Sequence, residues 1–200
     1  MSVAMPRAAG TPIHQHAADN LRFIRDTMAR AGRFAAVPGW GGAAMGVTAL
    51  VTAALAGPPA QGTRWLAWWL ADALVAVAVG SVAMARKARR LDSTLTTGAS
   101  LQFARVFLPV VGAGAILTVA FVASGLTPRL PGCWLVTYGA AVAAAGALAV
   151  GPVARVGFVI LAIGVAAFAS PAAWGNIYMA LGFGVTQIVG GVAIGRAHHG

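Results

Sequence analysis

Residues 65–85 read WLAWWLADALVAVAVGSVAMA, an apolar run in which Asp72 is the only charged side chain. A helix of about 20 apolar residues can cross a hydrocarbon core of about 30 Å. A helix satisfies its backbone hydrogen bonds within the segment, which is required because lipid offers no partners. The run therefore predicts a transmembrane helix that carries one acid inside the membrane.

Five further runs approach or meet this length, so the sequence predicts an all-α integral membrane bundle of six transmembrane helices arranged as three hairpins. The six runs are residues 38–56, 65–85, 106–124, 133–151, 156–169 and 174–195. The fifth is the shortest, and it can be extended through the Gly-Pro-Val-Ala-Arg sequence at 151–155. We expect a cytoplasmic segment at 1–35, a transmembrane domain at 36–196 and a short cytoplasmic tail at 197–200.

The composition excludes a soluble domain. The chain is 59% hydrophobic and 9% charged, with a mean hydropathy of +0.80. A soluble domain carries about 25% charged residues. The net charge of +10 does not indicate nucleic-acid binding, because the basic residues flank the apolar runs and do not gather on one face. We therefore expect the lipid bilayer, and no nucleic acid, as the partner.

The distribution of lysine and arginine predicts the orientation. With the N-terminus inside, the inner side receives twelve basic residues and the outer side receives only Arg64 and Arg129. Cytoplasmic loops carry the excess of basic residues in membrane proteins. Residues 1–33 lack the apolar region of a signal peptide. We expect a multi-pass protein of the bacterial inner membrane with both termini in the cytoplasm.

The even-numbered runs share a rhythm, which fits three successive hairpins. Each opens with a tryptophan and ends at an arginine; the residues are Trp65, Trp134 and Trp174, and Arg86, Arg155 and Arg196. Internal duplication and ordinary aromatic and basic membrane flanks both explain this pattern. Before the first run, residues 19–34 have apolar side chains at helical spacing, which predicts an amphipathic helix on the membrane surface or against a partner.

Asp72 is the first candidate site residue, because ionisable groups inside a membrane usually face the bundle interior and find partners. Tryptophans precede it on the same helical face, and other polar side chains lie at similar depth. The predicted polar site comprises Asp72, Trp65, Trp68, Trp69, Tyr138, Asn176 and Tyr178. Two interpretations remain open: a cation or proton site behind aromatic rings, and a hydrogen-bonded aspartate that ties the second helix to the fourth and sixth.

Other residues carry weaker signals. Arg86, Lys87, Arg89 and Arg90 are candidates for binding anionic lipid headgroups, or simply fix the topology. The histidine pairs near the two termini lack further ligands, so we expect no metal and no cofactor. No hydrolase, zinc-protease or P-loop motif occurs, so we expect no enzyme. Small residues spaced by four favour a tight bundle and are compatible with a homodimer; examples are Gly42 with Gly46, Gly182 and Thr186 with Gly190, and Gly191 with Gly195.

Two stretches carry a family resemblance: DNLRFIRDTM at 19–28 followed by AVPGWGG at 36–42, and SPAAWGN at 170–176 followed by GFG at 182–184 and the end through Gly195-Arg196. They resemble a group of uncharacterised bacterial inner-membrane proteins. The resemblance implies six spans and a gene often found beside a winged-helix regulator, but no activity. One departure is Gln187, where a histidine is expected.

The residues favour a non-enzymatic membrane protein that binds a lipid, a small molecule or a partner protein and that has a regulatory role. The alternative is a small dimeric transporter or proton-coupled carrier that uses Asp72 as its coupling acid. Asp72→Asn separates the two, because it should abolish transport in a carrier and affect little beyond stability in a binding protein.

Overall fold

The computed structural model describes residues 20–21, 39–90, 98–147 and 151–197, and within these ranges it contains helices and turns and no strand. The helices are α2 (Gly39–Leu55), α3 (Thr63–Arg90), α4 (Gly98–Ala123), α5 (Leu130–Gly146), α6 (Gly151–Ala169), and a last helix made of α7 (Gly175–Met179), the π-helical η5 (Ala180–Val185) and α8 (Thr186–Ala197). The all-α class is confirmed, since each predicted run forms a helix. The expected amphipathic helix at 19–34, apart from residues 20–21, and the terminal tails lie outside the described residues.

Four of these helices are long and apolar enough to cross a membrane: Thr63–Arg86, Leu101–Ala123, Pro152–Ala169 and Ala172–Ala197. The third of them begins before residue 156, as expected from the turn sequence. The other two helices, α2 and α5, have 17 residues each, which gives a length of about 25 Å. That length is at the lower limit for a span, so the described residues contain four candidate spans and six spans stay a prediction.

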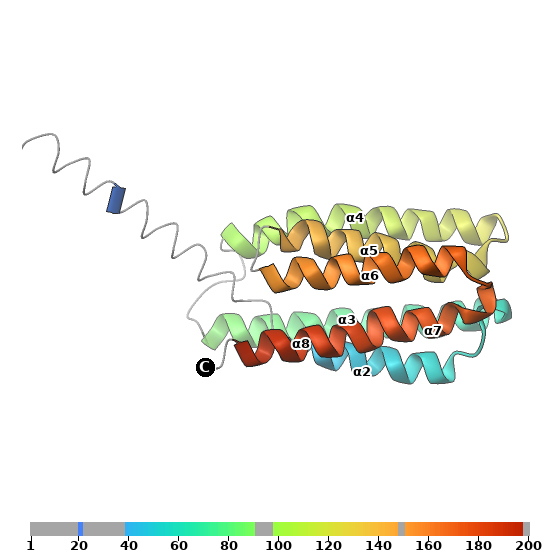
Figure 1. Ribbon diagram of the computed structural model, residues 1–200, viewed down its shortest axis with the longest axis horizontal. Coiled ribbons are helices and arrows are strands. Elements are labelled where there is room, and N and C mark those ends of the chain that lie inside the picture. The colour runs from blue at the N-terminus through green and yellow to red at the C-terminus, as the bar shows by residue number, and fades with distance from the viewer. Residues whose placement is uncertain (1–19, 22–38, 91–97, 148–150, 198–200) are drawn as a thin grey trace, which may run out of the picture. The chain divides into compact units, whose positions relative to one another are not determined.

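Consecutive helices are joined at one end of the bundle by short 3₁₀ helices, which are η2 (Pro59–Gln61), η3 (Thr127–Arg129) and η4 (Ala172–Trp174). The three 3₁₀ helices contact one another, and Figure 1 shows them at the end opposite the C-terminus. We call this the turn end. The first two turns use Gly57 and Gly125 at φ of +73° and +71°, a conformation that glycine adopts without strain.

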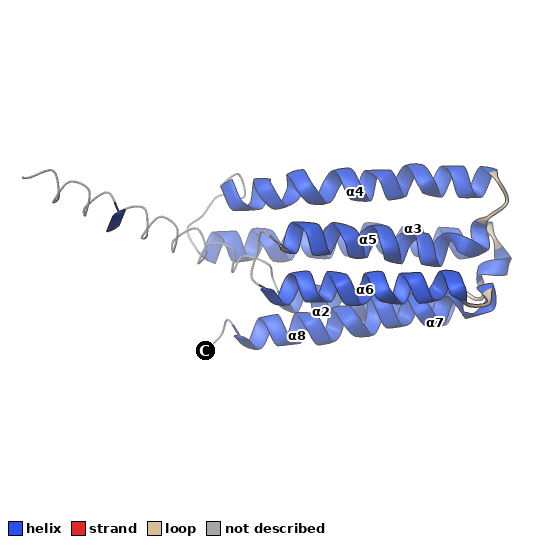
Figure 2. Ribbon diagram, turned by 45° about the horizontal axis from the view of Figure 1, so that its top comes forward, coloured by secondary structure: helices blue, strands red, loops and turns tan. Residues whose placement is uncertain are grey.

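The helices pack in two sets of three, α3–α2–α8 and α4–α5–α6. Figures 1 and 2 show the helices running alongside one another along the length of the bundle. The two sets meet where α6 contacts α8 and η5, and where α5 contacts α7. The most extensive contacts, α5 with α6 and α2 with α8, join helices from different hairpins. The order of packing therefore differs from the order of the hairpins.

Glycines bring α5 and α6 into backbone contact. A Cβ atom on Gly139 would lie 2.5 Å from the backbone nitrogen of Leu161, and one on Gly164 would lie 2.6 Å from that of Val136. Such distances leave no room for any side chain. Within a membrane, helices associate through van der Waals packing of this kind, because the lipid removes the hydrophobic drive between them.

The same device joins α2 to α8. A Cβ on Gly191 would meet the nitrogen of Ala43 at 2.5 Å, and one on Gly46 would meet the carbonyl oxygen of Gly184 at 2.6 Å. Small residues that the sequence analysis singled out, among them Gly46, Gly191 and Gly195, thus pack inside one chain. The tight bundle is confirmed, and these glycines give no support to a homodimer, which stays a prediction.

Two helices have most of their surface free of neighbouring helices. The main neighbour of α3 is α2, and that of α4 is α5. Their outer faces carry large apolar side chains such as Leu74, which is 74% exposed, and Ile116 and Val119, which are also exposed. A soluble protein would not tolerate a surface of this size, whereas acyl chains cover it in a bilayer.

Candidate functional site

Asn176, in the first turn of α7, is the centre of the polar contacts near the turn end. Its Oδ1 accepts hydrogen bonds from the indole nitrogens of Trp65 at 2.6 Å and Trp69 at 3.3 Å. Its Nδ2 donates to the carbonyl oxygens of Ala53, at 3.3 Å, and Gly57. The amide thereby uses both donors and both acceptor positions, and it joins α7 to α2 and α3.

The indole rings extend this cluster to the other set of helices. Trp65 is fully buried and stacks on Trp134 of α5, with ring centroids 5.4 Å apart and planes 14° apart. The Trp134 nitrogen donates to the Thr118 hydroxyl of α4 at 2.7 Å. The Trp69 ring packs on that of Phe183 in η5, with the ring centroids 6.4 Å apart. Together with Asn176, these rings form what we call the tryptophan cluster, which fixes the turn end of the bundle.

The two tyrosines pack against the same core and have separate partners. The Tyr138 hydroxyl accepts a hydrogen bond from Nε2 of Gln187 on α8 at 2.5 Å, and its ring meets Phe183 edge-on at 5.1 Å. The Tyr178 hydroxyl pairs with the Ser170 hydroxyl at 2.6 Å. Tyr138 therefore links α5 to α8, and Tyr178 links α7 to the end of α6. Gln187, which departs from the resemblance, is the partner of Tyr138.

Asp72 pairs with a different helix from the one expected. The Thr48 and Thr52 side chains of α2 interact with its carboxyl group, while the Thr48 hydroxyl donates its proton to the carbonyl oxygen of Met45 at 2.8 Å. Thr48 and Thr52 are one helical turn apart, so they present both hydroxyls on one face. Asp72 is half-buried, and Thr52 is buried. The aspartate thus ties α3 to α2 within the first hairpin.

The predicted polar site consequently divides. Trp65, Trp69, Tyr138, Asn176 and Tyr178 lie in or against one hydrophobic core. Asp72 lies at the contact of α3 with α2, where its partners were not predicted. Trp68 is on the outer side of α3, 39% exposed, and belongs to neither group.

The opposite end of the bundle is basic. It is formed by the end of α3, the starts of α4 and α6 and the end of α8 (Figure 1), and we call it the basic end. The described arginines near it are Arg86, Arg89, Arg105, Arg155 and Arg196, whereas Arg64 and Arg129 lie near the turn end. Arg86 and Arg89 are exposed, and the side chains of Lys87 and Arg90 lie outside the described part of the chain.

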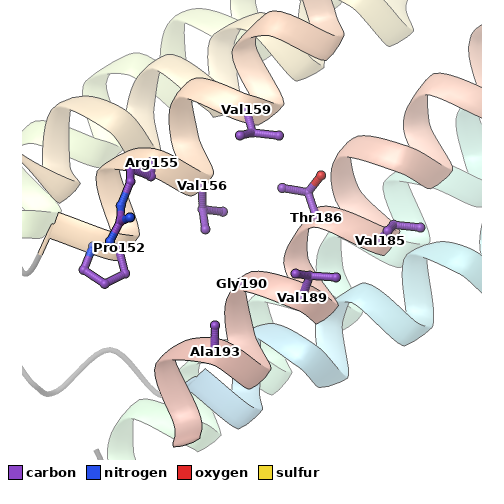
Figure 3. Close-up of a pocket in the computed structure, with 9 residues that line it drawn as sticks. All are labelled: Pro152, Arg155, Val156, Val159, Val185, Thr186, Val189, Gly190 and Ala193. Atoms are coloured by element: carbon purple, nitrogen blue, oxygen red, sulfur yellow. The ribbon is translucent and has the colours of Figure 1, made fainter. Parts of the chain in front are cut away.

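A groove between α6 and α8 was not predicted from the sequence. Its volume is about 490 Å³, and the residues that line it are Pro152, Arg155, Val156, Val159, Val185, Thr186, Val189, Gly190 and Ala193. Figure 3 shows Arg155 and Pro152 on one wall near the start of α6, and Ala193 and Val189 on the facing wall of α8. The described lining residues other than Arg155 and Thr186 are apolar. Gly190 lets α8 approach α6 closely, since a Cβ there would lie 2.5 Å from Cγ2 of Val156.

The π-helical segment η5 ends at this groove. The Thr186 hydroxyl donates to the carbonyl oxygen of Leu181 at 2.8 Å, five residues earlier. The same carbonyl oxygen also accepts the backbone N–H of Thr186, which closes the π turn, so it has two donors from one residue. Single π turns inside α-helices are rare and often occur at functional sites. The glycines at 182 and 184 were visible in the sequence, but they do not distinguish a π turn from close packing.

The described residues offer little reactive chemistry. No group of three or more histidine, cysteine or acidic side chains among them could hold a metal ion. Each buried polar side-chain atom in the described ranges has a hydrogen-bonding partner. The arrangement can tie helices together, contact lipid and place a guanidinium beside an apolar groove.

Comparison with family models, with curated proteins and with solved structures gives no match to this chain. The resemblance drawn from residues 19–42 and 170–196 therefore stays a prediction. The function has to be argued from the groove, the tryptophan cluster and the basic end.

Proposed function

We propose that this chain is a non-enzymatic, multi-span protein of the bacterial inner membrane that binds a membrane lipid in the groove between α6 and α8. The observation that carries the proposal is the groove itself, which lies between two helical stretches that are each long and apolar enough to cross a membrane. Its volume of about 490 Å³ is within the range of about 300–1,000 Å³ that is usual for ligand sites.

The surroundings of the groove favour lipid over a soluble ligand. Val159, Val185 and Val189 line it and are also exposed on the outside of the helices; Val189 is 62% exposed. In a bilayer such side chains face acyl chains, which are present at high local concentration. A water-soluble molecule would have to leave water to reach them, and it would find few polar partners there.

The proposal includes six spans with both termini in the cytoplasm. The basic end carries five of the described arginines and the turn end carries two, as the positive-inside rule requires if the basic end is cytoplasmic. The 17-residue helices α2 and α5 lie alongside their longer neighbours (Figure 1) and pack against them through glycine residues. A bundle that thins the bilayer locally accommodates spans of this length.

Filling the groove tests the proposal. Ala193→Phe places a ring between α8 and α6, and the matched control is Ala162→Phe, at an exposed position of α6 that does not line the groove. Lipids that remain on the purified protein are counted by native mass spectrometry after graded detergent washing. We expect Ala193→Phe to lose the retained lipid and Ala162→Phe to keep it. Equal retention by both variants and the parent protein would refute lipid binding in the groove.

A carrier that uses Asp72 is the second candidate, and the two hydroxyl partners of Asp72 favour it. Thr48 and Thr52 add oxygen atoms beside the carboxyl group, a set that suits a proton or a small cation. The test is ion or proton flux into proteoliposomes, with Asp72→Asn as the inactive variant. Flux that is abolished by the substitution supports a carrier, and flux that is absent from the parent protein removes this candidate.

A further inference from the structure

Arg155 occupies the end of the groove near the membrane boundary. It is in the second turn of α6, its side chain is exposed, and it is the only charged one among the described residues that line the groove. Figure 3 shows it next to Pro152 on the α6 wall. Val156 follows it, and Val159 lies one turn further, about 6 Å deeper along the helix. Along this wall the side chains thus change from a charged guanidinium near the membrane boundary to apolar valines nearer the bilayer centre.

The facing wall provides a track for an acyl chain. Val185, Val189 and Ala193 of the last helix are spaced by four residues, which places them along one face over about 12 Å. Lipid tails are as apolar as these side chains, so an acyl chain gains little by leaving the bilayer for the groove. Any preference for one lipid over another must therefore arise at the headgroup, where Arg155 lies.

Within the described part of the chain, the charged side chains of the first turns of α6 and the last turn of α8 are basic. The first turn of α6 contains no acidic residue, and the last turn of α8 carries Arg196. The start of α6 also presents backbone N–H groups and the positive end of its helix dipole. A guanidinium offers five N–H donors, so a contact with the protein still leaves donors for a phosphate. Arginine binds phosphate through two parallel hydrogen bonds, which a lysine ammonium does not form.

We propose that the groove between α6 and α8 is a site for an anionic phospholipid, whose phosphate is held by Arg155 and one of whose acyl chains lies along Val156, Val159, Val185 and Val189. This inference rests on the proposed function and specifies its ligand. A basic residue near the surface attracts an anionic lipid by about 1 kcal/mol, so the expected preference over a zwitterionic lipid is about fivefold. The lipid belongs to the leaflet that faces the basic end.

The experiment measures lipid preference in nanodiscs that contain phosphatidylcholine and a minor fraction of phosphatidylglycerol. Lipids retained by the protein are counted by native mass spectrometry, for the parent protein and for Arg155→Gln, Arg155→Lys and the double variant Arg86→Gln with Arg89→Gln. We expect the parent protein to retain phosphatidylglycerol about fivefold over phosphatidylcholine. Arg155→Gln should retain the two lipids equally, Arg155→Lys should show a reduced preference, and the double variant should match the parent.

The outcomes separate this inference from the proposed function. Equal retention of both lipids by the parent protein, together with loss of both in Ala193→Phe, would overturn the headgroup assignment and leave lipid binding in place. Retention that Ala193→Phe does not change would overturn lipid binding itself. A preference that survives in Arg155→Gln and disappears in the double variant would move the headgroup site to the end of α3. Should Arg155→Gln fail to fold, Arg155→Lys and the loss of preference with added salt in the parent protein decide the question.

Discussion

Replacing Asn176 with leucine removes the amide that joins α7 to α2 and α3 but keeps a side chain of similar size. Four hydrogen bonds are lost, two from the indole nitrogens of Trp65 and Trp69 and two to backbone carbonyls. Hydrogen bonds between membrane helices contribute about 0.6 kcal/mol on average and at most about 1.7. Four average bonds give about 2 kcal/mol, and a buried donor left unpaired costs about 1–3 kcal/mol. We expect the free energy of unfolding to fall by roughly 2–4 kcal/mol.

The assay is reversible unfolding in mixed micelles, followed by tryptophan fluorescence, because Trp65 is fully buried and reports on the turn end. Trp69→Phe, which replaces the indole by a smaller phenyl ring and removes the donor to Asn176, completes a double-mutant cycle with Asn176→Leu and leaves Trp65 in place as the reporter. The two losses should be less than additive, since both variants break the same bond. A loss below about 0.5 kcal/mol for Asn176→Leu, or strict additivity of the pair, would refute the central role of Asn176.

Two further predictions concern packing. Gly157→Ala directs a methyl group into the backbone of Ala143, and it should lower the free energy of unfolding by roughly 1–3 kcal/mol. The control is Gly112→Ala, at a position with open space, which should leave the free energy of unfolding unchanged or raise it by up to about 1 kcal/mol. Thermal melting of both variants checks the difference. Cys133 is 4% exposed, so it should react with a membrane-permeable maleimide only as the protein unfolds, and fast labelling of the folded protein, seen as a mass increase, would contradict this packing of α5.

Hydropathy located the long helices in the described part of the chain, but it did not locate their ends. The second run was expected at 65–85, and α3 continues to Arg90. Lysine, arginine and alanine favour the helical conformation, so the helix persists after the chain leaves the apolar layer. For the same reason α4 begins at Gly98, well before residue 106. The length of an apolar run reports the thickness of the membrane and not the length of the helix.

The partners of the polar residues could not be predicted, because depth along a helix does not specify which helices are neighbours. Asp72, Asn176 and Tyr138 were placed together on depth alone. In the structure Asp72 interacts with Thr48 and Thr52 of α2, two threonines that do not stand out within an apolar run. Asn176 instead accepts hydrogen bonds from the indole N–H groups of Trp65 and Trp69. A hydropathy scale treats tryptophan as an apolar residue, so it does not reveal these donors.

The groove was hidden from the sequence for a related reason. It lies between α6 and α8, and only the fold shows that these two helices are neighbours. A sequence-level sign was present in Arg155, which is followed directly by the apolar residues of α6. Arg155 contributes to the predicted orientation as one of the inner basic residues, and its position beside apolar residues does not by itself predict a groove.

The pairing of α2 with α8 has a consequence for biosynthesis. The ribosome delivers α2 before α8, so the glycine face of α2 lacks the helix that covers it in the fold until α8 has been synthesised. A product truncated before α8 would leave that face open to chaperones and proteases.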